Sequence, residues 1–323
     1  MRHHNKHQPL FAMILIFASV LQGCNESGDD IGATTVDYND GSIWVTRTPL
    51  PTSRWGLTSC ASNDRLYVFG GADHETVNEA FDPETNQWTT KAPLPTPRRY
   101  GATCSVINNR IYLIGGYDTL DSVDVYDPAS DSWSSAAAMP TPRHNFTTSV
   151  VNGRIYAIGG RDNTTGVLDT VEEYDPTTDS WTTKTAMPVG HHSPTSAAVN
   201  GKIYVIGGYN NAGFSNLVYE YDPSYDVWTT KAFMPTQRTS HTSSAINGKI
   251  YSIGGTSGVD AIATVEEYDP QSNTWAVKTE IPTARETHAA STFHNVIYVF
   301  GGRASSTYNS PLQSVESYAP VND

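Results

Sequence analysis

Basic residues are scarce in this chain of 323 residues, in which 20 lysines and arginines stand against 33 aspartates and glutamates for a net charge of −13. Such an acidic protein lacks the basic surface that neutralises phosphate groups, so we expect no nucleic-acid partner. Cysteine is also scarce, with three residues at spacings that match no zinc motif. Glycine-rich phosphate loops and nucleophile elbows are missing as well. We therefore expect neither a cofactor nor a bound metal.

Long apolar runs are missing too, since the longest extends only from Leu10 to Leu21 and is too short to span a bilayer. It follows the basic residues 2–6, an order typical of a signal peptide. It ends at Leu21-Gln22-Gly23-Cys24, which is similar to a bacterial lipobox. The sequence therefore predicts a lipoprotein signal peptide at residues 1–23 and lipidation of Cys24. An ordinary cleaved signal followed by an incidental cysteine is the alternative.

Residues 24–41 are polar and acidic, a composition that suits a flexible, hydrated tether. We expect the mature protein in the bacterial cell envelope, where it would contact the membrane only through the lipid. Asn25 follows the cysteine, and by analogy with enterobacterial lipoprotein sorting it favours the outer membrane.

The rest of the chain is organised by six glycine pairs, spaced 44 to 48 residues apart, each of which ends an apolar-Tyr-x-apolar run. Such a run is typical of a β-strand stopped by glycine, and a fixed period of this length indicates a repeat architecture. The pairs are Gly70-Gly71, Gly115-Gly116, Gly159-Gly160, Gly207-Gly208, Gly254-Gly255 and Gly301-Gly302.

An aromatic-Asp-Pro turn follows each of the first five pairs, and a tryptophan stands five residues after its proline: Trp88, Trp133, Trp181, Trp228 and Trp275. Because Asp-Pro favours a turn, each unit contains four antiparallel strands. We label them a (small residues), b (Gly-Gly), c (Tyr) and d (Trp). The sixth unit lacks a tryptophan, whereas an unassigned Trp44 precedes the first. We therefore expect residues near Trp44 to supply strand d of the last unit.

This Gly-Gly, Tyr and Trp pattern resembles the kelch repeat over residues 42–320. The resemblance implies an all-β fold, a six-bladed kelch β-propeller closed by an N-terminal outer strand. Cys60 and Cys104 lie on the a strands of neighbouring blades, one residue out of register and hence on opposite strand faces. We expect two buried thiols rather than a disulfide.

One face of the ring should carry both the d-to-a links and the b-to-c loops, because strands a and b are antiparallel. By resemblance, kelch proteins bind ligands or partners there, and varied loops on a repeated frame suggest a ligand surface. Loops that merely drift in solvent would look the same. Our ligand-face candidates are His191, His192, Tyr209, Asn210, Asn211, Tyr117, Asp118, Arg161 and Arg303.

Five blades have an arginine three residues after a link proline and an acid two residues before the strand-c aromatic. Blade 4 has neither, and carries His191 and Tyr219 instead. The joint loss predicts a structural ion pair in the other blades. Blade 4 is then either the functional site or a degenerate repeat.

Two functions follow as hypotheses. The first is a lipid-anchored binding module, not an enzyme, that presents its loop face to a protein or glycan ligand. The second is an envelope carbohydrate enzyme, a sugar epimerase resembling the bacterial sialic-acid mutarotases (N-acetylneuraminate epimerase-like). Its acid–base candidates would be His191, Tyr219 and Asp162.

Overall fold

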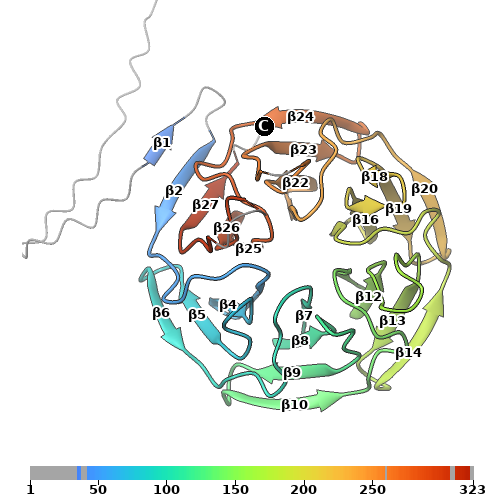
Figure 1. Cartoon of the computed structure of the whole chain (residues 1–323), viewed down its shortest axis with the longest axis horizontal. Helices are drawn as coiled ribbons and strands as arrows, with labels where there is room; N and C mark the ends of the chain where they lie inside the picture. Colours follow the sequence, from blue (N-terminus) through green and yellow to red (C-terminus); the bar gives the residue numbers. More distant parts are fainter. Residues whose placement is uncertain (1–34, 38–41, 259, 306–309, 321–323) are drawn as a thin grey trace, which may run out of the picture. The chain divides into compact units, whose positions relative to one another are not determined.

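The structure is a computed structural model that describes residues 35–37, 42–258, 260–305 and 310–320. The described residues form antiparallel sheets joined by turns and contain no helix (Figure 1). Accordingly, none of them belongs to a helix that could cross a membrane. Six sheets are arranged radially around one axis, with strand a innermost and strand d outermost (Figure 1).

In the first three blades the strands follow one another along the chain from the axis outward. Blade 1 contains β3 (Thr58–Ser62), β4 (Arg65–Phe69), β5 (Asn78–Asp82) and β6 (Gln87–Thr90). Blade 2 contains β7 (Thr103–Ile107), β8 (Arg110–Ile114), β9 (Val123–Asp127) and β10 (Ser132–Ala136). Blade 3 contains β11 (Thr147–Val151), β12 (Arg154–Ile158), β13 (Val171–Asp175) and β14 (Ser180–Lys184).

Blade 4 contains β15 (Thr195–Val199), β16 (Lys202–Ile206), β19 (Val218–Asp222) and β20 (Val227–Thr230). Its b-to-c loop forms an additional hairpin of β17 (Tyr209–Asn210) and β18 (Gly213–Phe214). Blade 5 contains β21 (Thr242–Ile246), β22 (Lys249–Ile253), β23 (Val265–Asp269) and β24 (Thr274–Lys278). Blade 6 contains β25 (Ala289–Phe293), β26 (Val296–Phe300), β27 (Val315–Ala319) and β2 (Ile43–Arg47).

The ring is closed by the N-terminal strand β2, which pairs with β27 so that Trp44 stands opposite Tyr318. The prediction of a six-bladed propeller closed by an outer N-terminal strand is therefore confirmed. A further strand, β1 (Thr35–Asp37), pairs with β2 on its outer side. It lies within the stretch predicted as a tether. The predicted signal peptide and Cys24 lie outside the described residues.

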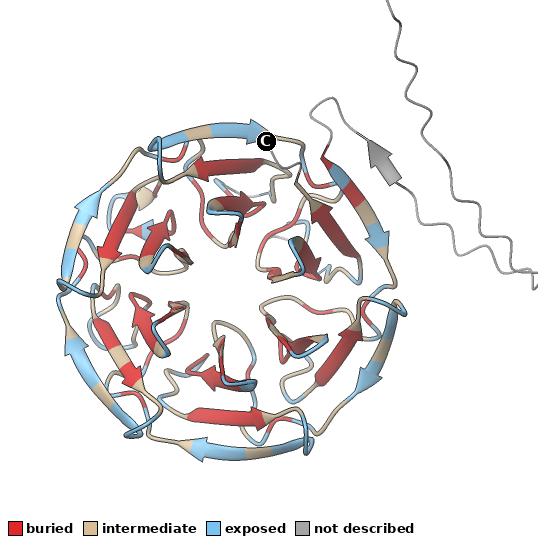
Figure 2. Ribbon diagram, turned by 180° about the vertical axis from the view of Figure 1, so that it is seen from behind, coloured by how far each residue is buried: buried red, intermediate tan, exposed pale blue. Residues whose placement is uncertain are grey.

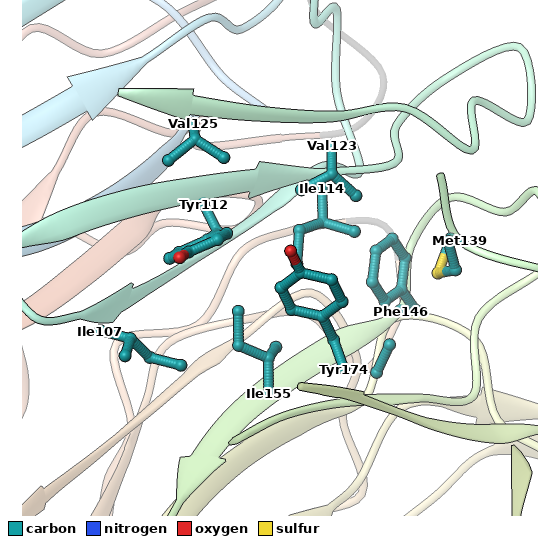
Figure 3. Close-up of a cluster of buried hydrophobic side chains, with 10 residues drawn as sticks. Ile107, Tyr112, Ile114, Val123, Val125, Met139, Phe146, Ile155 and Tyr174 are labelled. Atoms are coloured by element: carbon teal, nitrogen blue, oxygen red, sulfur yellow. The ribbon is translucent and has the colours of Figure 1, made fainter. Parts of the chain in front are cut away.

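Burial explains why the repeat has this pattern. The b and c strands are almost wholly buried, whereas the d strands are exposed on their outer side (Figure 2). The apolar cores lie between blades rather than within them. In one core, Tyr112 and Ile114 of blade 2 face Ile155 and Tyr174 of blade 3 (Figure 3). Each blade is thus stabilised by its neighbours, as expected of stacked repeats.

The tryptophans fix the register between blades. Each indole nitrogen donates a hydrogen bond to a backbone carbonyl just beyond strand d of the preceding blade. In five blades the distance is 2.9 to 3.0 Å, for Trp88 to Thr48, Trp133 to Ala92, Trp181 to Ala137, Trp228 to Thr185 and Trp275 to Ala232. Trp44 bonds to Thr279 in the same way, at 3.2 Å. The closing strand therefore uses the contact that joins every other pair of blades.

The glycine pairs allow the links to approach the blades closely. Gly70 has φ +56°, and a Cβ there would lie 2.4 Å from the carbonyl oxygen of Arg98 in the next blade. Gly254 has φ +62°, and a Cβ would lie 2.6 Å from the carbonyl oxygen of Arg285. A side chain at either position would force neighbouring blades apart.

Cys60 and Cys104 form a disulfide between β3 and β7, with their Cα atoms 6.2 Å apart. The prediction of two separate thiols is therefore wrong. It assumed that opposite strand faces keep the cysteines apart. In a propeller, however, blade 1 faces blade 2 with one side of its sheet, and blade 2 faces blade 1 with the other side. Side chains that meet between the two blades therefore come from opposite strand faces. The offset of one residue is what brings the two sulfur atoms together.

Candidate ligand-binding site

Five blades contain the predicted ion pair between the link arginine and the strand-c acid. The N–O distances are 2.5 to 2.8 Å, and each arginine side chain is at most 1% exposed. The pairs are Arg54–Glu79, Arg98–Asp124, Arg143–Glu172, Arg238–Glu266 and Arg285–Glu316. Blade 4 lacks both the arginine and the acid, and the ion pair that this joint loss predicted for the other five blades is confirmed.

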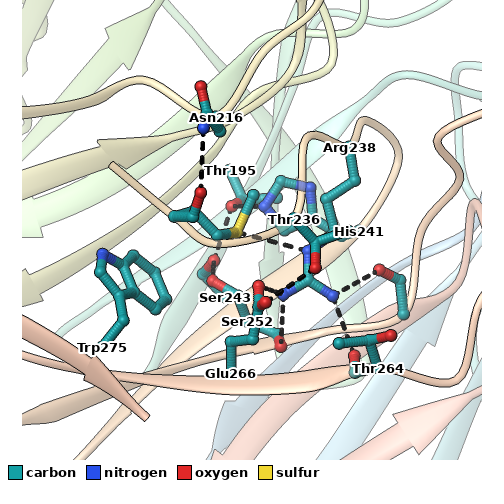
Figure 4. Close-up of polar contacts among 12 residues, drawn as sticks. Thr195, Asn216, Thr236, Arg238, His241, Ser243, Ser252, Thr264, Glu266 and Trp275 are labelled. Carbon is teal, nitrogen blue, oxygen red and sulfur yellow. Dashed lines mark hydrogen bonds and ion pairs between the residues drawn. The ribbon is translucent and has the colours of Figure 1, made fainter. Parts of the chain in front are cut away.

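Arg238 illustrates how the pair works (Figure 4). Its Nη2 lies 2.5 Å from Glu266 Oε2, and its Nη1 donates to the carbonyls of Gly254 at 3.1 Å and Thr264 at 2.9 Å. The hydroxyl of Thr236 donates to the other oxygen of Glu266 at 2.8 Å. Burial lowers the pKa of Arg238 to about 10 although Glu266 opposes this, so the guanidinium stays charged at neutral pH. The arginine thus fastens the b-to-c loop to strand c.

Blade 4 uses the same buried position differently. His191 Nδ1 lies 3.0 Å from the carbonyl oxygen of Val189, so Nδ1 carries the proton and Nε2 accepts. Nε2 accepts from the Ser215 hydroxyl at 3.0 Å and from the Asn210 amide at 3.1 Å. Both partners belong to the b-to-c loop, and the ring of Tyr219 lies 6.2 Å away. His191 therefore holds the β17–β18 hairpin instead of strand c.

The residues around the axis come from two places in each blade, just before strand a and just after the glycine pair. The two places face each other across backbone bridges, which join His144 to Arg161, His192 to Tyr209, Thr239 to Thr256 and Glu286 to Arg303. Strand geometry therefore places the d-to-a links and the b-to-c loops on one face, as predicted. We call this the mouth face.

A cavity of about 430 Å³ opens on the mouth face at the axis, and we call it the mouth cavity. Its wall includes one residue of each blade located two positions before strand a, for example Asn145, Ser193, Ser240 and Thr287. Backbone hydrogen bonds link these residues across blades, such as Thr287 N to Ser240 O at 2.9 Å and Asn145 N to Gly101 O at 2.9 Å.

Three of these wall residues hold a conformation that their side chains disfavour. Ser193, Ser240 and Thr287 have φ between 49° and 56°, although none of them is glycine or asparagine. Such left-handed positions persist only where the surroundings fix them, and they gather at functional sites. The wall of the mouth cavity is therefore rigid before any ligand arrives.

Aromatic rings form an arc along one side of the mouth face. The Arg303 guanidinium lies 4.3 Å from the ring centre of Trp55. Trp55 stacks on Tyr100 at 5.6 Å, and Tyr100 contacts Tyr117 at 4.5 Å. Tyr117 in turn meets His144 edge-on at 6.1 Å. Trp55, Tyr100 and Arg303 are partly exposed and line the mouth cavity, so parts of the rings are available to a ligand.

The titratable groups beside the mouth cavity are mostly neutral imidazoles. Burial lowers the pKa of His192 to about 4, with Arg161 and His144 adding to the effect. Burial also lowers the pKa of His144, and the pKa values of His241 and His288 lie well below the usual value. In contrast, burial raises the pKa of Glu286, which Arg303 contacts at 2.9 Å. Among the described residues, no group of three or more histidines, cysteines or acids could hold a metal.

Comparison with known proteins agrees with this architecture. The family model of the Attractin/LZTR1 β-propeller matches residues 79–266, which is more than half of the chain. The chain belongs to this family. The model of the kelch motif matches residues 54–95 and 284–323 on either side. The kelch β-propeller fold supports a role as a protein-interaction module.

Individual relatives of this kelch propeller match over short segments. Kelch-like protein 36 of Rattus norvegicus and of Mus musculus are 34% identical over 61 residues, 16% of this chain and 10% of theirs. Kelch-like protein 23 of Mus musculus is 35% identical over 66 residues, 20% of this chain and 11% of its own. The match thus spans about a tenth of the length of these relatives. The solved structure of YjhT superposes with a TM-score of 0.72 at 18% identity, covering 83% of this chain and 96% of YjhT. That likeness concerns the fold.

The structure separates the predicted site residues of the kelch propeller into three groups. Arg303 and His192 line the mouth cavity, and Tyr117 contacts Tyr100 of its wall. Arg161, Tyr209, Asn210 and Asn211 lie farther out, between the b-to-c loops of blades 3 and 4. Asp118 is exposed beside Tyr117.

The proposed acid–base residues form the third group. His191 and Tyr219 are buried inside blade 4, at 1% and 5% exposure. Asp162 accepts hydrogen bonds from the backbone of Thr164, Thr165 and Gly166, at 2.6 to 3.0 Å. Its carboxylate therefore shapes its own loop.

Sequence reasoning missed Trp55 and Tyr100, the centre of the aromatic arc. Both stand three residues before strand a. That position also holds His144, His192, Thr239 and Glu286 in the other blades. The residue type at this position differs from blade to blade, whereas the link arginine nearby recurs in five blades. This variation could have marked the position as part of a ligand site. Sequence reasoning also missed the threonine that follows the link proline in five blades. Blade 4, which lacks the arginine, lacks this threonine as well and has Val189 in its place.

Proposed function

We propose that this kelch propeller is a binding module for carbohydrate, and that the sugar enters the mouth cavity. The observation that carries the proposal is the lining of that cavity. Partly exposed Trp55 and Tyr100 line it together with residues that bear hydroxyl and amide groups, such as Ser240, Thr287 and Asn145. Sugars match this lining, because they combine apolar C–H surface with many hydroxyl groups.

A flat protein surface fits the mouth face less well. A stable protein interface buries about 800 Å² on each partner around an apolar centre. Among the described residues of the d-to-a links and b-to-c loops, the exposed large hydrophobic side chains are Tyr117, Tyr209, Val189 and Phe233, at 36% to 54%. The mouth face is instead hollow and polar, and a cavity of about 430 Å³ is within the usual range for small-ligand sites.

The test is a glycan array probed with the full chain, followed by titration calorimetry on the best binder. We expect Trp55→Ala and Tyr100→Ala to weaken binding at least tenfold. Tyr225→Ala is the matched control, because Tyr225 is 78% exposed in the turn between β19 and β20, away from the cavity. No glycan binding at all, or equal loss in all three variants, would contradict the proposal.

We further propose that the module is exported and held on a membrane by lipid on Cys24, facing away from the cytoplasm. The disulfide Cys60–Cys104 supports export, since disulfides persist in oxidising compartments. The measurement is incorporation of labelled palmitate in a bacterial host, with Cys24→Ala as the comparison. Label retained in Cys24→Ala would exclude this anchor.

A carbohydrate enzyme is the second candidate. Glu286 is buried behind Arg303 of the cavity wall and bonds to it at 2.9 Å, and burial raises the pKa of Glu286. Carboxyls with a shifted pKa are frequent in acid–base sites. The check is nuclear magnetic resonance of anomer interconversion for each sugar that binds, with and without the protein. If the protein leaves the rate of anomer interconversion unchanged for every sugar that it binds, the enzyme hypothesis fails and only the binding function stands.

A further inference from the structure

Two further hollows lie beside the mouth cavity, between blades 3 and 4. His192 lines the mouth cavity and also a second hollow of about 390 Å³, with Arg161 and Tyr209. Asn210 and Asn211 line this second hollow and a third of about 740 Å³. Each hollow shares wall residues with the next, so the three are adjacent. We call the outer two the radial groove.

One wall of the radial groove is the β17–β18 hairpin, and its position depends on His191. The Asn210 amide donates to His191 Nε2 at 3.1 Å, while Asn210 Oδ1 accepts from the backbone of Ala212 at 2.8 Å. Tyr209 packs edge-on against Phe214 across the hairpin at 5.3 Å. The blade that lacks the arginine pair is therefore the blade whose loop is anchored as a groove wall.

The opposite wall is the 161–167 loop of blade 3, and it is held by Asp162. The Thr165 hydroxyl donates to Asp162 Oδ2 at 2.8 Å, and three backbone amides donate to Oδ1. Arg161 and Val167 close the loop through a backbone bridge. Both walls are thus ordered by internal hydrogen bonds, as expected of a preformed site.

The lining of the radial groove continues the chemistry of the mouth cavity. Asn211 and Arg161 are exposed, and Arg161 forms no ion pair with any described residue. Val167 and Val189 supply apolar contact, and His192 is neutral at pH 7. Amide and guanidinium donors beside apolar patches suit the hydroxyls and C–H faces of successive sugar units.

We propose that the ligand is a linear glycan, with one end in the mouth cavity and the following units in the radial groove. This inference rests on the proposed function and adds the length and direction of the ligand. His191 is a positioning residue, because it acts through Asn210.

The test uses the full chain and mono-, di-, tetra- and hexasaccharides of β-1,4-linked glucose, β-1,4-linked N-acetylglucosamine and α-1,4-linked glucose. We expect at least one series to bind tenfold or more tightly as it grows from one to six units. A series whose affinity is the same at every length would overturn the radial groove and leave the mouth site standing. If no member binds at any length, the proposed function fails and the groove fails with it.

Variants locate the added affinity. Asn211→Ala and Arg161→Ala should weaken hexasaccharide binding about tenfold and leave the monosaccharide unchanged, whereas Trp55→Ala should weaken both. Arg110→Ala is the matched control, since Arg110 is an exposed arginine at the opposite end of its blade. His191→Ala should behave like Asn211→Ala if it folds. Equal losses for short and long chains in the two surface variants would contradict the groove.

Discussion

At one buried position, five blades carry an arginine and blade 4 carries His191. The arginine stabilises the fold, whereas the histidine shapes the candidate site. In the five blades an arginine ties the b-to-c loop to a strand-c carboxylate, as Arg143 does with Glu172 at 2.5 Å. In blade 4 the neutral His191 bonds instead to Asn210 and Ser215 of the loop and to the carbonyl of Val189. The loop forms an additional hairpin, and strand c has Tyr219 where the other blades have the carboxylate.

This comparison implies that the two kinds of blade contribute differently to stability. A charged guanidinium buried beside one carboxylate depends strongly on that partner. A neutral imidazole carries no such charge, so its loss leaves only unpaired hydrogen-bonding groups. Stability should therefore be concentrated in the arginine blades, and ligand binding in blade 4.

The largest expected effect breaks one arginine pair. Arg143→Ala should lower the free energy of unfolding by about 3–5 kcal/mol, because it leaves Glu172 buried without its cation. His191→Ala should cost about 1–2 kcal/mol. Urea denaturation of both variants measures the contrast. Equal costs would mean that blade 4 is an ordinary worn repeat.

A second prediction asks whether covalent linkage is independent of the arginine pairs. Replacing both cysteines of the Cys60–Cys104 disulfide by alanine should lower the free energy of unfolding by about 2–4 kcal/mol. Combined with Arg143→Ala, the two losses should add to within about 0.5 kcal/mol, because the sites share no partner. The measurement is a double-mutant cycle in urea, and strong coupling would show that the blade junctions are not independent.

A third prediction converts blade 4 to the arginine rule. His191→Arg alone should destabilise by about 3 kcal/mol, because Tyr219 offers no carboxylate to the buried guanidinium. Adding Tyr219→Glu and Val189→Thr should recover most of that loss, since these positions match Glu172 and Thr141 of blade 3.

The recovered variant should still bind the hexasaccharide less tightly, because Asn210 has lost its anchor. Thermal unfolding and calorimetry report the two effects separately. Recovery of both stability and binding would contradict the role given to His191.

The last effect is the smallest at neutral pH and grows as the pH falls, since His241 and His288 are also buried neutral histidines whose pKa values lie well below the usual value. Below about pH 6.5 these imidazoles bind protons in the unfolded chain but stay neutral in the folded protein. The free energy of unfolding is therefore full above that pH and falls as the pH drops. Each such group contributes up to about 1.4 kcal/mol per pH unit.

Replacing both by leucine, the residue that blade 1 has as Leu57 in the equivalent place, should flatten the acid side of the stability curve. The measurement is urea unfolding between about pH 4 and pH 7, the range in which the unfolded imidazoles gain their protons. An unchanged slope would mean that other groups dominate acid unfolding.

The fold, the closure of the ring and the buried ion pairs could be predicted from the sequence alone. The glycine pairs, the tyrosines and the tryptophans recur because every blade meets its neighbour through the same contacts, so one repeat predicts the next. Trp44 could be assigned to blade 6 for that reason. Its hydrogen bond to Thr279 is equivalent to the one that Trp88 donates to Thr48. The arginine pairs could be inferred because both partners are missing from the same blade.

Which side chains meet around the axis becomes known only from the three-dimensional structure. Trp55, Tyr100 and Arg303 belong to three different blades, and no periodic signal tells which variable residues will stack. The Cys60–Cys104 disulfide and the radial groove likewise depend on how one blade faces the next. Contacts within a repeat follow from local sequence, because strand pairing fixes them. Contacts between the variable residues of different repeats follow from the rotation of one blade against another, which is set by the packing of the whole ring.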